Sequence, residues 1–174
     1  MILSGLKIVD EIRKKNINIE PFDEELLNPN SYNYRLGNEL FEITDNVIDP
    51  KKKTNYKTIK LTAAGYVLKP HHLYLASTLE KIGSSKYVTQ LIGRSSVGRM
   101  GLFLQVTAPL GHVGCNHCWT LELKAVQPLR IYPGMKIGQV TFWCLNGEKT
   151  ITYETGKYNH YTRPHVSMYY KKGM

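Results

Sequence analysis

The feature that most constrains the fold is a period of two in the hydrophobic pattern between residues 59 and 153. In its clearest stretch, apolar side chains occupy every second position: Trp119, Leu121, Leu123 and Ala125. Shorter alternating stretches occur at residues 73–79 and 102–106, and Gly and Pro residues separate them. This alternation is typical of half-buried β-strands joined by turns. The pattern therefore predicts an all-β sandwich, jelly roll or barrel.

A different pattern precedes the strands. Residues 4–15 predict one amphipathic helix with Ser4 as its N-cap. The expected buried stripe consists of Leu6, Ile8, Val9 and Ile12. The run Lys51–Lys53 lies in a polar stretch, which is typical of a solvated loop.

Length and composition limit the class of protein. A chain of 174 residues fits one domain, and we find no boundary within residues 1–174, although residues from about 154 to 174 form a weakly patterned C-terminal arm. The formal net charge of +9 favours an anionic partner, either a nucleotide phosphate, a nucleic acid or a membrane surface. Three cysteines imply no disulfide framework, and we find no signal peptide or apolar span. We therefore expect a soluble cytoplasmic protein.

The sharpest local motif is Gly-Arg-Ser-Ser-Val-Gly-Arg at residues 93–99. A glycine followed by two hydroxyl residues can open a short helix whose free backbone N–H groups face an anion. Arg94 and Arg99 flank the hydroxyls, and each guanidinium can bind phosphate oxygens with paired donors. The motif predicts a phosphate site without the Walker lysine. The alternative is a capped helix that carries surface arginines.

With its neighbours, this motif makes the chain recognisable. The sequence resembles the dCTP deaminase branch of the trimeric dUTPase superfamily over nearly its whole length. The matching segments are residues 1–5, 29–31 with 35–37, 93–108, 120–123, 133–139 and 156–158. The resemblance implies a mainly β, dUTPase-like jelly-roll or β-clip barrel with a short N-terminal helix and a C-terminal arm. It also implies a homotrimer with active sites at the subunit interfaces.

The resemblance further implies the roles of individual residues. Arg94, Ser95, Ser96 and Arg99 would hold the phosphates and help to order the reacting water. Thr107 and Ala108 would line the pyrimidine, and Tyr153 and Lys157 would close over a triphosphate whose charge Mg²⁺ neutralises. The other expected substrate contacts are His112, Thr120, Leu121, Gln139 and Tyr161.

Glu122 is the expected catalytic centre. By resemblance, the reaction is hydrolytic deamination of a deoxycytidine nucleotide, which supplies deoxyuridine nucleotide for thymidylate synthesis. One carboxylate can take a proton from the attacking water and deliver protons in turn to N3 and to the leaving amine, provided that burial raises its pKa. Strand alternation places Glu122 on the face opposite Leu121 and Leu123. Without the family match, a salt bridge to Lys124 is the simpler reading.

A zinc mechanism is the obvious competitor. Cys115-x-x-Cys118 resembles half of the signature of zinc nucleobase deaminases, but the H-x-E half is absent and no proline precedes Cys115. We therefore expect no zinc and no metal bound by protein side chains. A structural metal held by His112, Cys115, His117 and Cys118 is the alternative.

Four positions depart from the family pattern. His112 stands where the family usually has an aspartate that contacts the sugar, which argues against dUTP diphosphate hydrolysis. Cys115 replaces an aromatic residue, and Asn33 replaces an aspartate. Tyr161 is nearest the place of a glutamine that holds the terminal phosphates, so dCMP or a modified cytosine nucleotide is an alternative to dCTP.

Two other functions compete with deamination. The first is a catalytically silent homologue that binds nucleotides and regulates a partner. The second is a basic protein that binds RNA or DNA, against which the lack of aromatic–basic stacking motifs argues.

Overall fold

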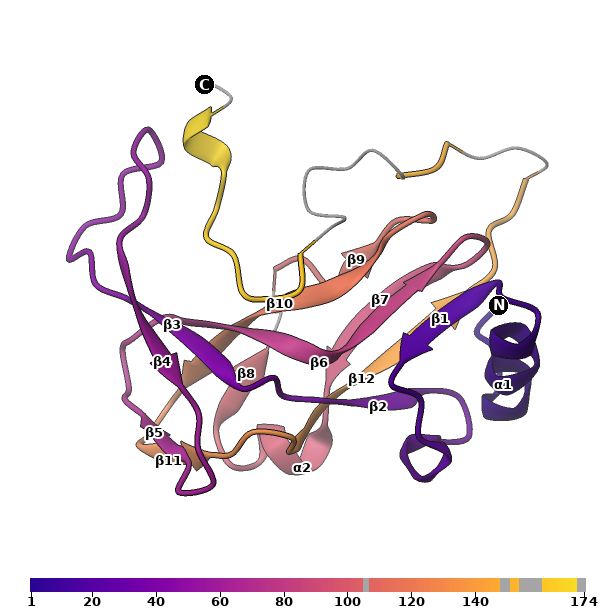
Figure 1. Cartoon of the computed structure of the whole chain (residues 1–174), viewed down its shortest axis with the longest axis horizontal. Coiled ribbons are helices and arrows are strands. Elements are labelled where there is room, and N and C mark those ends of the chain that lie inside the picture. Colours follow the sequence, from indigo (N-terminus) through magenta and orange to yellow (C-terminus); the bar gives the residue numbers. More distant parts are fainter. Residues whose placement is uncertain (105–106, 148–150, 154–160, 172–174) are drawn as a thin grey trace.

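The computed structural model describes residues 1–104, 107–147, 151–153 and 161–171. Short helical segments are α1 (Gly5–Arg13), η1 (Glu24–Leu26), α2 (Ser95–Gly98) and η2 (Tyr169–Lys171). The strands are β1 (Ile17–Glu20), β2 (Tyr32–Arg35), β3 (Glu39–Ile43), β4 (Tyr56–Lys60), β5 (Tyr66–Leu68), β6 (Tyr74–Ser84), β7 (Val88–Gly93), β8 (Leu102–Leu104), β9 (Leu110–Gly111), β10 (Asn116–Ala125), β11 (Leu129–Ile131) and β12 (Lys136–Trp143). The prediction of a mainly β chain with a short N-terminal helix is confirmed (Figure 1).

The described strands form three sheets rather than one closed barrel. The six-stranded sheet has the order β4-β3-β6-β10-β8, with β1 paired to β6. The four-stranded sheet has the order β2-β12-β7-β9, and β11 pairs with β5. Every pairing is antiparallel. Within the described residues, no helix is both long and apolar enough to cross a membrane.

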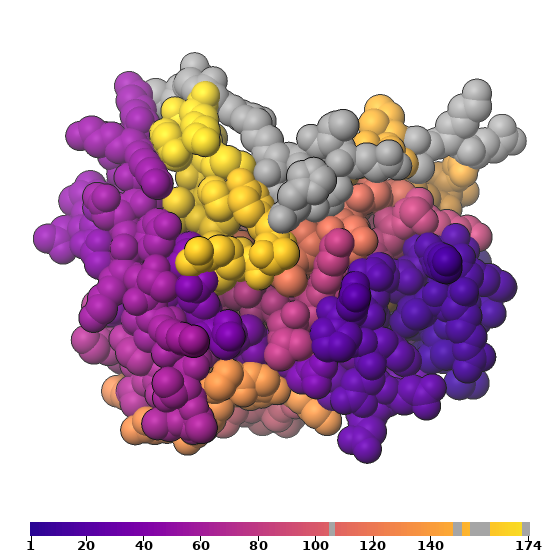
Figure 2. All heavy atoms as spheres, in the orientation of Figure 1, coloured from indigo at the N-terminus to yellow at the C-terminus, as the bar shows by residue number. Residues whose placement is uncertain are grey.

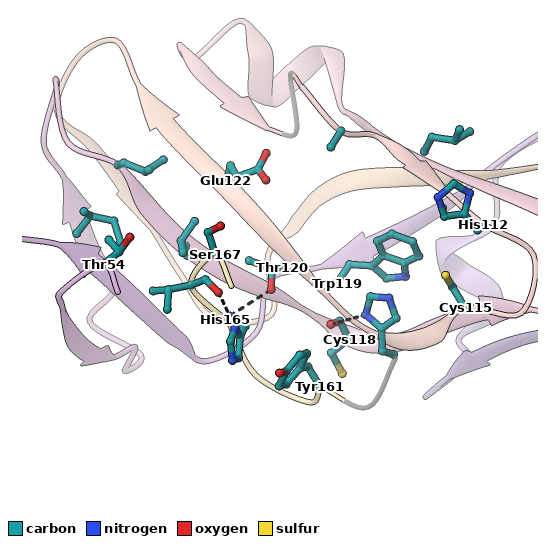
Figure 3. Close-up of a pocket in the computed structure, with 18 of the residues that line it drawn as sticks. Thr54, His112, Cys115, Cys118, Trp119, Thr120, Glu122, Tyr161, His165 and Ser167 are labelled. Atoms are coloured by element: carbon teal, nitrogen blue, oxygen red, sulfur yellow. Dashed lines mark hydrogen bonds between the residues drawn. The ribbon is translucent and has the colours of Figure 1, made fainter. Parts of the chain in front are cut away.

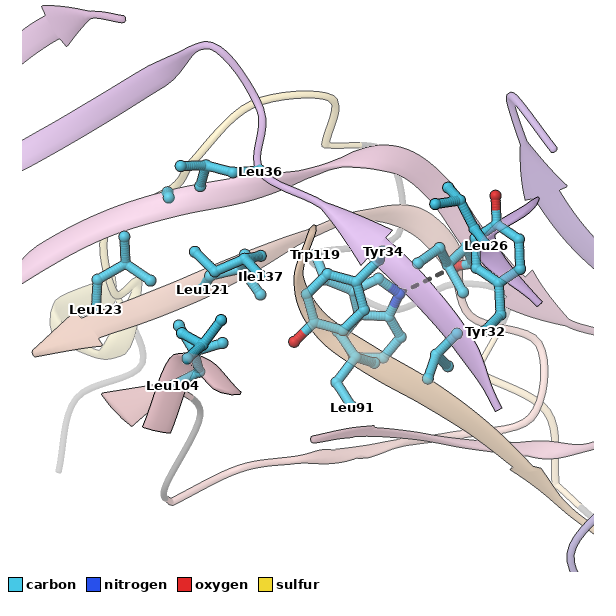
Figure 4. Close-up of a cluster of buried hydrophobic side chains, with 14 of the residues drawn as sticks. Leu26, Tyr32, Tyr34, Leu36, Leu91, Leu104, Trp119, Leu121, Leu123 and Ile137 are labelled. Atoms are coloured by element: carbon cyan, nitrogen blue, oxygen red, sulfur yellow. Dashed lines mark hydrogen bonds between the residues drawn. The ribbon is translucent and has the colours of Figure 1, made fainter. Parts of the chain in front are cut away.

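The main core brings together side chains from both larger sheets. Leu121 and Leu123 of β10 are fully buried there, together with Leu91 of β7 (Figure 4). The ring of Trp119 packs in the same core, and its Nε1 donates a hydrogen bond to the Ile82 carbonyl at 3.0 Å. The alternation predicted for this strand is therefore confirmed, and it leaves the even-numbered side chains on the other face of β10.

The N-terminal helix forms with the predicted cap but with a different buried face. The Ser4 hydroxyl accepts a hydrogen bond from the Lys7 N–H at 3.4 Å. The expected stripe is wrong at Leu6, which is 83% exposed, whereas Ile8 and Glu11 are buried. A close approach of the backbone sets this face, because a Cβ on Gly5 would lie 2.3 Å from the Asn28 carbonyl oxygen.

The leucines that alternate near residue 75 also face differently from a simple amphipathic strand. Leu73 and Leu79 are each 38% exposed, and Tyr74 and Ala76 fill the core instead. Leu75 packs with Phe41 and Val166 in a second apolar cluster. Since Val166 belongs to the C-terminal segment, this segment covers part of the sheet's outer face, as the yellow atoms show in Figure 2.

A buried ion pair fixes the junction between β2 and β6. The Glu80 carboxylate is fully buried and accepts hydrogen bonds from the Arg35 Nε at 2.6 Å and from the Arg35 backbone N–H at 2.8 Å. Hydrogen bonding to Glu80 raises the pKa of the Arg35 guanidinium. The guanidinium therefore remains charged at neutral pH.

We expect Arg35→Met to lower the free energy of unfolding by about 3 kcal/mol, because it leaves the Glu80 charge buried without its partner. Urea denaturation at pH 7 measures the change. The matched control is Arg163→Met, which breaks the more exposed pair with Glu39 (2.9 Å) and should cost less than about 1 kcal/mol. Equal losses for the two variants would contradict the assigned role of the buried pair.

Candidate active site

A cavity of about 500 Å³ lies over the outer face of β10 and β6, and we call it the Glu122 cavity. Figure 3 shows Glu122 and Thr120 projecting from β10, with His112 and Cys115 at the other end and Tyr161 and His165 along one side. Its lining residues are Ile43, Ile48, Thr54, Leu73, Leu75, Ala108, Leu110, Gly111, His112, Cys115, His117, Cys118, Trp119, Thr120, Glu122, Tyr153, Tyr161, His165, Val166 and Ser167.

Glu122 is the one acidic side chain among these described lining residues. It lies opposite Leu75 in the β10–β6 ladder, next to the apolar cluster that contains Phe41 and Val166. Burial raises the pKa of the Glu122 carboxyl above its ordinary value, since the apolar surroundings disfavour the charged form. A carboxyl of this kind can exchange protons closer to neutral pH than an exposed glutamate can.

The C-terminal segment forms one wall of the cavity. The Cys118 N–H donates to the Tyr161 carbonyl at 3.0 Å, and the His165 N–H donates to the Thr120 hydroxyl at 3.2 Å. The Tyr161 and His165 rings lie 4.2 Å apart between centroids. These contacts lay residues 161–167 along β10, next to Glu122.

His112 and Tyr153 form the opposite end of the cavity. Their ring centroids are 5.3 Å apart, and the Tyr153 N–H donates to the Val113 carbonyl at 2.7 Å. Strand β9 ends at Gly111, immediately before His112, and this position requires a glycine because a Cβ on Gly111 would lie 2.1 Å from the Thr89 hydroxyl oxygen. The residue before His112 is thus packed closely against Thr89 of β7.

His117 and Trp119 also line the cavity, although the sequence pattern does not predict this. Their rings lie 4.4 Å apart, and the His117 Nδ1 lies 3.0 Å from the Cys118 carbonyl oxygen, so Nδ1 is the protonated nitrogen. Burial lowers the pKa of His117, which favours the neutral ring. An irregularity between Cys118 and Thr120 changes the strand register here. The alternating pattern gives no signal of such a bulge.

The thiols at this end are not arranged as a metal site. Burial raises the pKa of both Cys115 and Cys118, and each is a free cysteine. Within the part of the chain that the structure describes, no three His, Cys, Asp or Glu side chains are grouped so as to hold a metal ion. The alternative of a structural metal at His112, Cys115, His117 and Cys118 therefore has no support in these residues.

The predicted phosphate-binding residues lie elsewhere in the chain. Ser95, Ser96 and Arg99 are exposed on or beside α2, which Val97 anchors in the core, and Arg94 is partly exposed at its N-cap. None of them lines the Glu122 cavity of the same chain. Figure 1 shows α2 at one edge of the molecule and the C-terminal segment at the opposite edge.

The remaining predicted contacts divide into three groups. Ala108, His112, Thr120, Tyr153 and Tyr161 line the cavity with Glu122. Thr107 is exposed outside the lining, and the Leu121 side chain is buried in the core, so that only its backbone is available to a ligand. Gln139 accepts a hydrogen bond from the Ser31 hydroxyl at 2.7 Å, away from this cavity, and Lys157 lies outside the described residues.

Comparisons with known proteins identify the family. The sequence model of the family described as dCTP deaminase-like matches residues 2–145. A Hathewaya histolytica protein named "dCTP deaminase, dUMP-forming" is 46% identical over 171 residues, 98% of each chain. Proteins of the same name from Clostridium beijerinckii and Cytophaga hutchinsonii are each 45% identical over 98% of each chain.

A solved structure supports the fold. The crystal structure of 2'-deoxycytidine 5'-triphosphate deaminase from Agrobacterium tumefaciens superposes with a TM-score of 0.65 at 19% identity. The match covers 81% of this chain and 47% of that chain. The geometry defines a mainly β protein whose cavity has, among its described lining residues, one carboxyl group of raised pKa. The chain belongs to the dCTP deaminase family.

We expect Glu122→Gln to raise the thermal stability of the folded chain at pH 8. The folded state binds the Glu122 proton more tightly than the unfolded chain does, so ionisation destabilises the fold increasingly as pH rises through the raised pKa. Below the unfolded pKa of about 4.3, Glu122 is protonated in both the folded and the unfolded chain, so the gain in stability should vanish. Measurement of Tm from pH 4 to pH 8 tests this. A variant that is less stable than the parent at pH 8 would refute it, and Glu20→Gln, on an exposed part of β1, is the control.

Proposed function

We propose that this chain hydrolytically deaminates dCTP without zinc, with Glu122 as its general acid–base group. The observation that carries the proposal is the placement of Glu122 as the one acidic group of the described lining, with a pKa raised by burial. The full-length similarity to proteins named dCTP deaminase supports the substrate. The deoxyuridine nucleotide formed would supply thymidylate synthesis in the cytoplasm.

The chemistry follows from a single carboxyl. Ionised Glu122 accepts a proton from water as the water oxygen bonds to C4 of cytosine, and it passes this proton to N3. It then takes the proton of the new C4 hydroxyl and gives it to the amino group, so that the C4–N bond breaks, ammonia leaves and the C4 carbonyl forms. Apolar neighbours such as Leu75 and Val166 keep the carboxyl basic enough to accept the first proton. Thr120, two residues earlier on the same strand, lines the cavity beside it, and its hydroxyl, which accepts the His165 N–H, would help to orient the base.

The phosphates require groups that this cavity does not provide by itself. No Lys or Arg occurs in its described lining, whereas Arg94 and Arg99 lie at α2 with two serine hydroxyls. We propose that α2 of a second subunit completes the site in a homotrimer, since a cyclic assembly can repeat one such contact at every interface. The α2 donors fit phosphate oxygens rather than a metal, so Mg²⁺ would be held through the nucleotide phosphates and would neutralise part of their charge.

The proposal also covers the identity of the product. The relatives' names specify dUMP, which requires release of diphosphate in addition to deamination. We propose dUMP as the product here because the similarity extends over 98% of each chain. Accumulation of dUTP would instead support the expectation drawn from His112, which occupies the end of the cavity beside Tyr153.

One observation keeps the silent regulator as a second candidate. His112 lines the cavity with an imidazole where the family pattern has an aspartate. A site without this aspartate could bind a nucleotide and fail to turn it over. Tight binding of dCTP with no product over hours would identify it.

We expect the purified protein to release ammonia from dCTP, and Glu122→Gln to lower kcat/KM about 10²- to 10⁴-fold, the range typical of a lost general acid–base group. Chromatography of products from dCTP, dCMP, dUTP and CTP measures reaction, substrate and product together. Glu20→Gln, an exposed change of the same kind, should retain the parental rate. Near-full activity of Glu122→Gln would refute the mechanism, and sensitivity of the parent to zinc chelators would refute zinc independence.

We expect subunit mixing to restore activity if α2 acts across an interface. Glu122→Gln and Arg99→Ala subunits should each be inactive alone, because each lacks one half of the site. After denaturation and co-refolding in equal amounts, about a quarter of the sites in random trimers combine two intact halves. Recovery near that fraction supports the shared site. No recovery from mixtures shown to form mixed trimers would place both residues in one subunit's site.

A further inference from the structure

A second hollow adjoins the Glu122 cavity, and we call it the Lys52 groove. It has a volume of about 290 Å³ and is lined by Ile48, Pro50, Lys52, Thr54, Ser167, Tyr169 and Tyr170. Three of these residues, Ile48, Thr54 and Ser167, also line the Glu122 cavity, so the two hollows are contiguous. In Figure 1, the loop between β3 and β4 and the short helix η2 rise next to each other and form its two walls.

The charge of the groove favours an anion. None of its described lining residues is acidic, and Lys52 lines it between two further exposed lysines of the same loop, Lys51 and Lys53. The Lys52 side chain is 81% exposed, and its Nζ lies 3.7 Å from Asp49, which makes a weak pair. Segment 45–57 has four lysines and two aspartates, a net charge of +2, and exposed Lys171 adds a charge from η2.

Aromatic rings occupy the wall opposite the lysines. Tyr169 is 54% exposed although it lies in a hollow, and Tyr170 is beside it with the Lys171 Nζ 6.0 Å from its ring centroid. An exposed ring flanked by lysines provides a stacking surface for a base and counter-charges for its phosphates. No local sequence motif predicts this combination, because residues 51–53 and 169–171 are far apart in the chain.

We propose that the Lys52 groove binds a nucleoside polyphosphate other than the substrate, with its base on Tyr169 and its phosphates on Lys51–Lys53 and Lys171. The volume is at the lower end of that of small-molecule sites, which suits one base and its sugar rather than a strand of bases. Since Ser167 lines both hollows, the bound nucleotide contacts the segment that walls the Glu122 cavity. The site does not rest on the proposed deamination.

The test is calorimetric titration of the full chain with ATP. ATP is a purine nucleotide, whereas the proposed active site takes a pyrimidine nucleotide. We expect ATP to bind, and affinity to fall about tenfold or more both in Tyr169→Ser and in a Lys51→Gln, Lys52→Gln, Lys53→Gln triple variant. All four side chains are exposed, so the fold should be retained, and circular dichroism checks this. The control removes three exposed lysines elsewhere, Lys15, Lys69 and Lys86, by the same substitution.

Each outcome decides the proposal. Loss of ATP binding in the groove variants, with binding kept in the lysine control and in Arg99→Ala, supports it. Absence of ATP binding, or equal binding by parent and groove variants, overturns it. An equal loss of ATP affinity in the lysine control would mean that net charge alone explains the binding, and this outcome also overturns the proposal. If oligo(dT) binds through the same lysines and ATP does not, the groove belongs to a nucleic-acid strand instead.

Discussion

The packing of β10 between a core and a cavity is the constraint on which the rest of the structure depends. Leu121 and Leu123 are fully buried between the two larger sheets. Successive side chains of a strand point to opposite faces, so this burial obliges Glu122 to face outward. A slip by one residue would bury the carboxyl and expose two leucines, which makes the register strongly determined. The candidate catalytic group is thus placed by the hydrophobic effect.

The outer face of β10 is partly covered and is not fully exposed to solvent, and this determines the proton affinity of Glu122. Leu75, Phe41 and Val166 form a second apolar cluster beside Glu122, and the C-terminal segment bonds to β10 through Cys118 and Thr120. The resulting partial burial raises the pKa of the carboxyl. It disfavours the ionised folded state while making the group a better proton acceptor. The burial that supports the proposed activity therefore lowers the stability of the fold.

The two halves of the proposed site lie apart within one chain. Glu122 lies under the C-terminal segment, whereas Arg99 and Ser95 are on an exposed helix at the other edge. A triphosphate carries more negative charge than the described lining of the Glu122 cavity can neutralise, because that lining contains no Lys or Arg. This separation is the physical reason why the proposed function includes a second subunit.

The sequence by itself determined the strand content, the cap at Ser4, the inward face of β10 and the family, because these follow from local periodicity and short motifs. It misjudged Leu6, and it did not reveal that His117 and Trp119 line the cavity. The close contact at Gly5 and the irregularity after Cys118 set those orientations, and both depend on chain segments that are distant in sequence. Only the tertiary structure decided what surrounds Glu122 and what lies beside Lys52. The burial and the local charge of a side chain depend on all its neighbours in space, and these come from segments that are distant in the sequence.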